Sequence, residues 1–114
     1  MRPMNTTMDE LVDELLSISN WGDLALWKRE HEISLDLVRR IASRIRHLVG
    51  SDARAALRLS EWAIDLSLDL GDRFGKALAL RAKGEALVRL DDNLQAIEYF
   101  NEALKVYKEL DDEL

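Results

Sequence analysis

Cysteine is absent from the chain, so disulfide bonds and thiolate metal sites are excluded. This absence fits a cytoplasmic protein, which is the location we expect. The one proline is Pro3, and nothing after it forbids helix. No apolar run approaches the roughly 20 residues of a membrane span, and the N-terminus lacks the apolar region and cleavage site of a signal peptide. We therefore expect no membrane partner.

Basic residues are in the minority. The 114 residues include 16 Lys and Arg against 22 Asp and Glu, which gives a formal net charge of −6. Because phosphate binding needs a basic field, nucleic acid is not an expected partner. The length suits one domain and is too short for two good cores. A content of 47% hydrophobic and 33% charged residues is typical of a helical protein.

Apolar residues recur at helical spacing along the chain, with no sustained strand alternation between turn signals. Polar caps and glycines divide them into six segments, whose short connections favour antiparallel neighbours. The sequence therefore predicts an all-α fold of about six helices. The segments run from after Thr7 to Ile18, with Asn20 and Gly22 as breakers, from Leu24 to Trp27 or Ile33, from Leu37 to Val49, from Ser51 or Asp52 to Gly71, from Asp72 to about Asp91, and from Asp92 or Asn93 past Tyr107.

Two parts of the sequence repeat at an offset of forty residues. Ala56 falls on Ala96, and Ala63 falls on Ala103. The preceding helices match less well, at an offset one residue shorter, which places Ile45 over Gly84. Two helix–turn–helix units therefore follow one another in the chain.

The second unit has small and bulky residues at fixed intervals. Gly84 costs about 1 kcal/mol of helix propensity relative to alanine, which is explained if two helices cross closely there and Phe100 fills the groove between them. The spacing resembles that of the tetratricopeptide repeat family. The residues that match are Leu80, Gly84 and Leu87 on the first helix and Ala96, Phe100 and Ala103 on the second.

The resemblance implies antiparallel helix hairpins stacked as a short right-handed solenoid. It is incomplete, because leucines 80 and 87 replace the usual aromatics and Lys108 stands where the family often has proline. The period of forty residues exceeds the usual value of about 34. It is similar to the long-period repeats of large bacterial regulatory and effector proteins. The alternative is an ordinary six-helix bundle whose small residues meet by chance.

These patterns divide the chain into three parts. Residues 1–34 are expected to form an N-terminal capping hairpin, 35–71 a degenerate repeat, and 72–114 a clear repeat followed by the start of a further helix. The pairs Asp91–Asp92 and Asp111–Asp112 are typical of acids that cap helix N-termini. We expect the chain to be a piece of a longer protein.

No catalytic arrangement is found in the sequence, so an enzyme is not expected, and neither is a cofactor. His31 and His47 lie on different helices, and neither has a histidine partner at metal-binding spacing. Trp62 is expected in the core, whereas Trp21 or Trp27 either closes the end of the core or anchors a partner.

Charge is unevenly distributed along the chain. Residues 33–50 have a net charge of +3, with four basic residues and one acidic, and residues 72–90 also reach +3, with five and two. The segments 1–32, 51–71 and 91–114 have net charges of −4, −2 and −6. The third and fifth helices are therefore basic, and the fourth and sixth are acidic.

The family resemblance implies that the first helix of each repeat lines a concave face. That places Arg39, Ala42, Arg46 and Val49 beside Leu78, Arg81, Glu85 and Val88, with Arg89 at the edge. The candidate partner-binding residues are Arg39, Arg46, Arg81, Glu85 and Arg89. The alternative is that these arginines lie on a solvated face and pair with acids of neighbouring helices.

Two functions are compatible with this sequence. The first is a protein–protein interaction scaffold that binds an acidic peptide or a neighbouring domain through its concave face. The second is a structural segment of a larger solenoid, attached to a downstream effector or enzyme domain. In that case the C-terminal helix, around Val106 and Leu110, would mediate self-association.

Overall fold

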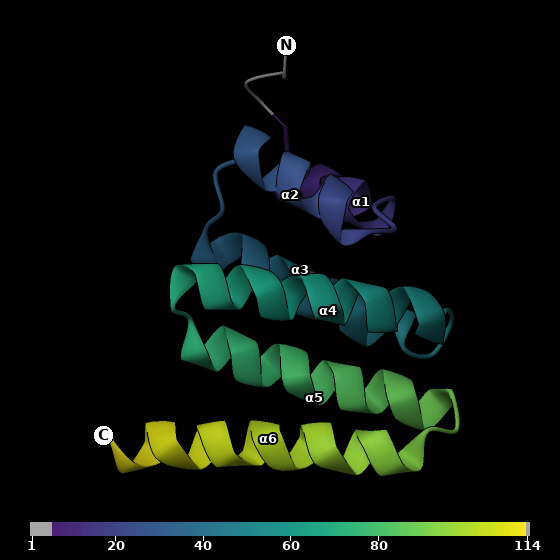
Figure 1. The fold of residues 1–114 in the computed structure, drawn as a ribbon, viewed down its shortest axis with the longest axis vertical. Helices are drawn as coiled ribbons and strands as arrows, with labels where there is room; N and C mark the ends of the chain where they lie inside the picture. The colour runs from purple at the N-terminus through teal and green to yellow at the C-terminus, as the bar shows by residue number, and fades with distance from the viewer. Residues whose placement is uncertain (1–5, 114) are drawn as a thin grey trace.

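The computed structural model describes residues 6–113, and within them it contains helices and no strand. The all-α prediction is confirmed, and so is the number of helices. Figure 1 shows them stacked in chain order, with the two ends of the chain at opposite ends of the stack. The helices are α1 (Met8–Leu16), α2 (Trp21–Glu30), α3 (Leu35–Leu48), α4 (Ala53–Leu70), α5 (Arg73–Arg89) and α6 (Asn93–Asp112).

Every helix begins at a side chain that accepts a hydrogen bond from a backbone N–H in its first turn. Asp52, Asp72 and Asp92 cap α4, α5 and α6 in this way. The sequence predicted Asp72, and it left Ser51 or Asp52 open for α4 and Asp92 or Asn93 open for α6. Asn20 was expected only to end the first helix, but it caps α2. The remaining caps are Thr7 for α1 and Ser34 for α3.

The structure decides one boundary that the sequence left open and corrects another. Ile33 lies in the connection between α2 and α3 instead of in a helix, because the chain becomes extended at His31. Asp111 and Asp112 form the last turn of α6 instead of beginning a new helix. A leucine followed by acids can continue a helix or precede a new one, so the sequence pattern did not decide between these two possibilities. Leu114 lies outside the described residues.

The turns before α5 and α6 have the same construction. Gly71 ends α4 with a φ of 65°, and Asp91 follows α5 with a φ of 62°, so both occupy the left-handed region. In each turn the next residue donates its N–H to a carbonyl five residues back, from Asp72 to Ser67 and from Asp92 to Leu87. The turn between the two repeat units and the turn inside the second unit therefore share one geometry.

The helices form two layers. In one layer α1 contacts α3, and α3 contacts α5, while α4 packs against both α3 and α5, and α6 packs against α5. The core between them is mainly aliphatic and includes Trp62, which is 2% exposed, as predicted. Trp27 is also buried, whereas Trp21 is half-exposed and stands edge-on against Trp62, with 4.6 Å between ring centroids.

The crossing of α5 and α6 is close at Gly84. A Cβ atom built there would lie 2.6 Å from Cε1 of Phe100, closer than real Cβ contacts come. Ala96 and Ala103, on the side of α6 that faces inward, are buried as well. The interpretation of Gly84 as a contact without a side chain is therefore confirmed.

Candidate functional site

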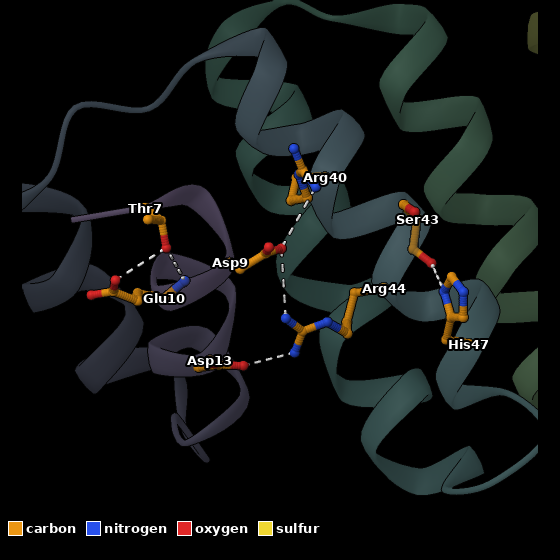
Figure 2. A network of polar contacts seen from close by, with 8 residues as sticks. All are labelled: Thr7, Asp9, Glu10, Asp13, Arg40, Ser43, Arg44 and His47. Carbon is orange, nitrogen blue, oxygen red and sulfur yellow. Dashed lines mark hydrogen bonds and ion pairs between the residues drawn. The ribbon is translucent and has the colours of Figure 1, made fainter. Parts of the chain in front are cut away.

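The basic residues of α3 divide into groups with different partners. Figure 2 shows the side that faces α1, where Arg40 and Arg44 meet acids of the first helix. Arg44 donates to Asp13 at 2.7 Å, and both arginines lie 3.8 Å from Asp9. These two arginines were not among the candidate partner-binding residues, and both pair with acids of a neighbouring helix. Because the acids are more than half exposed, each pair adds little stability.

Arg39 has a structural partner. Its guanidinium donates to both carboxylate oxygens of Asp72, at 2.7 and 3.1 Å, and lies 5.0 Å from the centre of the Phe74 ring. Asp72 is only 6% exposed and also accepts from the N–H of Gly75. Hydrogen bonds from Arg39 hold the pKa of Asp72 below its usual range, against the opposing effect of burial. Arg39 therefore joins α3 to the start of α5.

Gly75 makes room for this ion pair. A Cβ atom at Gly75 would lie 2.7 Å from Nη1 of Arg39 and would also overlap the Asp72 carboxylate. The glycine in the first turn of α5 thus makes room for the ion pair that joins α3 to the start of α5.

Arg46 and Arg81 lie at one hollow between α3 and α5. The hollow has a volume of about 120 Å³. Its lining combines two arginines and one glutamate with three apolar residues, so its net charge is +1. The lining residues are Ala42 and Arg46 of α3 and Leu78, Arg81, Ala82 and Glu85 of α5.

The two arginines are differently engaged. Arg81 donates through Nε to Glu85 at 3.2 Å, and this pair spans four residues along an exposed helix face. Such a pair contributes only about 0.3–0.5 kcal/mol, so a ligand carboxylate can compete for Arg81. Arg46 is exposed and makes no ion pair with any residue between 6 and 113. Among the residues that the structure describes, the hollow therefore has one arginine without an ion-pair partner and one with a weak partner.

The predicted site residues are thus only partly brought together. Arg46, Arg81 and Glu85 share the hollow. Arg39 lies elsewhere, in a hollow of about 440 Å³ between α1 and α3 that is also lined by Arg40. Arg89 is exposed in the last turn of α5 and lines neither hollow.

Ala82 lines the hollow but was missed in the sequence. It follows Leu78 by four residues and therefore lies on the same side of α5. The spacing could have identified it. Ala82 is 7% exposed.

Two further properties of the described chain bear on the site. Among residues 6–113, no group of three His, Asp or Glu side chains is arranged to hold a metal ion. His31 instead stacks on Trp27 with 4.2 Å between ring centroids, and His47 lies 2.9 Å from the Ser43 carbonyl, as Figure 2 shows. Within the same range, no helix has the length and apolar character needed to cross a membrane.

Comparisons of this chain with protein-family models, with curated proteins and with solved structures find no significant match.

Proposed function

We propose that this chain is a protein–protein interaction scaffold that binds an acidic peptide at the hollow between α3 and α5. The observation that supports the proposal is that Arg46 and Arg81 line one hollow together with the apolar residues Ala42, Leu78 and Ala82. Arginine forks suit carboxylates geometrically as well as electrostatically. The apolar lining residues would add contact with the aliphatic part of an aspartate or glutamate side chain.

The size of the hollow favours a peptide over a small molecule. Small-molecule pockets usually measure about 300–1,000 Å³, whereas this hollow has about 120 Å³. That volume suits one side chain of an extended or helical segment, and the rest of the segment would lie along the layer of α1, α3 and α5. No reaction is part of the proposal.

The proposed architecture is a tetratricopeptide-like solenoid. In this interpretation α1 and α2 form a capping hairpin, α3 with α4 the first repeat, and α5 with α6 the second. Two observations support it: the alternating layers and the close crossing of Gly84 and Phe100. The right-handed sense of the stack and the cytoplasmic, bacterial setting are parts of the same proposal.

A peptide-display selection tests the function. Peptides are selected on the immobilised chain and then measured against a double variant, Arg46→Glu with Arg81→Glu. We expect the selected peptides to contain aspartate or glutamate, to bind more weakly as salt rises, and to lose binding to the double variant. Arg89→Glu is the matched control, because Arg89 is exposed on the same helix but does not line the hollow.

The proposal fails if the selected peptides lack acids or bind the double variant as well as the original chain. Both arginines are exposed, so we expect the melting temperature of the double variant to stay nearly unchanged. Equal melting temperatures would show that a loss of binding does not come from unfolding.

The second candidate function, a structural segment of a larger solenoid, is favoured by a different observation. The apolar residues Leu94, Ile97 and Leu104 of α6 are exposed. Val106 and Leu110, the residues predicted for self-association, are half-buried. An outward-facing apolar surface therefore exists on α6, but on another side of the helix than the sequence indicated.

A further inference from the structure

Two exposed apolar side chains lie on either side of the hollow along α5. Phe74 is 45% exposed and Val88 is 46% exposed. Phe74 comes seven residues before Arg81, and Val88 comes seven residues after it. Seven residues make nearly two turns of helix, so the three side chains lie on one side of α5. Phe74 and Val88 are called the flanking pair below.

The flanking pair is placed symmetrically about the arginine. Seven residues of α-helix rise about 10.5 Å. Along α5, Arg81 therefore has an apolar side chain at this distance in both directions. A peptide that runs along α5 with an acidic residue at Arg46 and Arg81 also passes over both members of the pair.

Both members are rigid before a peptide arrives. The Phe74 ring has the guanidinium of Arg39 at 5.0 Å from its centre, and the Tyr107 ring stands edge-on to it at 6.0 Å between centroids. Val88 is branched at Cβ, and such a side chain has one preferred conformation in a helix. Contacts with side chains that are already ordered cost little entropy on binding. The flanking pair is thus suited to anchor a peptide.

The width of the groove between α3 and α5 favours an extended peptide. Arg39 of α3 contacts Asp72 and Phe74 at the start of α5. Ala42 of α3 and Ala82 of α5 line the same hollow, whose volume is about 120 Å³. The two helices are therefore close together. A helical ligand is about 10–12 Å wide with its side chains, so a thinner, extended chain follows this groove more closely.

The backbone of an extended peptide sets the spacing of its side chains. A polyproline II segment has three residues per turn, so every third side chain points the same way, and three residues rise about 9.3 Å. That rise is close to the distance of about 10.5 Å between Arg81 and each member of the flanking pair. A β-strand places every second side chain on one face, at about 6.6 or 13 Å, and fits less well.

Given the proposed function, on which this step rests, we infer that the ligand is an extended peptide with an acidic residue between two apolar residues. One apolar residue comes three positions before the acid, and the other comes three positions after it. The acid pairs with Arg46 and Arg81, and the apolar side chains lie on Phe74 and Val88. The pattern reads the same in both chain directions, so it holds whichever way the peptide runs.

A panel of labelled peptides tests the spacing by fluorescence anisotropy. The parent probe has one glutamate in a serine background, with a leucine three positions before it and another three positions after it. In the other probes the leucines stand two, four or seven positions away, or are replaced by serine. We expect the parent probe to bind about fivefold or more tightly than any other, because only its leucines reach both members of the flanking pair.

Substitutions in the chain identify the residues concerned. Val88→Ser and Phe74→Ser should each weaken binding of the parent probe about threefold or more, and should leave binding of the probe without leucines unchanged. Leu68→Ser is the matched control, because Leu68 is an aliphatic residue of α4 that is 58% exposed, and it should affect neither probe. We expect Val88→Ser to keep its melting temperature, since that side chain is already half-exposed.

Four results would overturn the inference. They are no binding of the parent probe, equal binding of all the glutamate probes, tightest binding at another spacing, and equal losses for both probes in Val88→Ser. A best spacing of seven would indicate a helical ligand instead.

Failure of the proposed function would look different. In that case a probe with glutamine in place of glutamate would bind as well as the parent probe, or the Arg46→Glu, Arg81→Glu double variant would bind the parent probe undiminished. Binding that depends on the glutamate but not on the leucine spacing would retain the proposed function and reject only the spacing.

Discussion

The ring of Phe100 covers Gly84 so closely that a single added carbon at Gly84 would overlap it. The built Cβ atom falls 2.6 Å from Cε1 and 2.8 Å from Cδ1 of the ring. A glycine in the middle of a helix is otherwise unfavourable. The contact explains why the chain has a glycine at this position of α5, and it fixes how closely α5 and α6 approach.

We predict that Gly84→Leu destabilises the chain by about 1–3 kcal/mol, because the new side chain overpacks the crossing. This happens although leucine is the better helix former. Urea denaturation followed by circular dichroism measures the change. A more stable variant would mean that Phe100 moves away at no cost.

The same contact can be tested by a double-mutant cycle. Gly84→Ala alone should raise the free energy of unfolding by less than the roughly 1 kcal/mol that the helix propensity of alanine offers, because the new Cβ meets the Phe100 ring. In a Phe100→Ala background the clash is absent, and Gly84→Ala should recover that full gain. Additive effects of the two substitutions would show that the residues do not interact.

The Asp72 carboxylate has two tasks, which substitutions can separate. Asp72→Asn keeps an acceptor for the Gly75 N–H and loses the charge that meets Arg39, so we expect a cost of about 1 kcal/mol. Asp72→Ala also loses the helix cap, which adds about 1 kcal/mol. Urea denaturation measures both variants, and equal costs would show that the cap contributes nothing.

The pH dependence of stability tests the Arg39–Asp72 pair. The folded-state pKa of Asp72 is below the usual carboxyl value of 3.8. A carboxyl group whose pKa is lowered by folding stabilises the folded state at pH values above its unfolded-state pKa. This contribution is lost as the pH falls through the lower folded-state pKa. Between about pH 5 and about pH 3, wild type should therefore lose more stability than Asp72→Asn. Parallel losses would contradict the depressed pKa.

Asp91 offers a stabilising substitution. It adopts a φ of 62° at the position that Gly71 occupies in the preceding turn. A left-handed conformation costs most residues about 1–2 kcal/mol, and aspartate less than most. We expect Asp91→Gly to raise the free energy of unfolding by about 0.5 kcal/mol or more. Destabilisation would indicate that the Asp91 side chain stabilises the turn.

The fold was predictable because local signals coincide. Asp52, Asp72 and Asp92 each cap a helix and come directly before a run of apolar residues at helical spacing. The helix ends that lack such a signal were not predicted correctly from the sequence. Ile33 continues an apolar pattern, but the backbone becomes extended two residues earlier, at His31. Asp111 lies in the last turn of α6, although the sequence was interpreted as starting a new helix there.

The site was only partly predictable, because helix spacing gives the direction of a side chain but not its partner. The family resemblance implied that Arg46 and Arg81 lie on one surface, and they line one hollow. It implied the same for Arg39, yet Arg39 bonds to Asp72. That pair depends on where the turn after α4 lies relative to α3, which no local pattern specifies.

The most direct test of the proposed function observes the arginine side chains themselves. An acidic peptide from the selection is titrated into the isotope-labelled chain, and the Nε–Hε signals of its arginines are followed by nuclear magnetic resonance. We predict that the signals of Arg46 and Arg81 shift on binding, while that of Arg39, held by Asp72, stays in place. Saturable binding that leaves Arg46 and Arg81 unmoved would contradict the proposal.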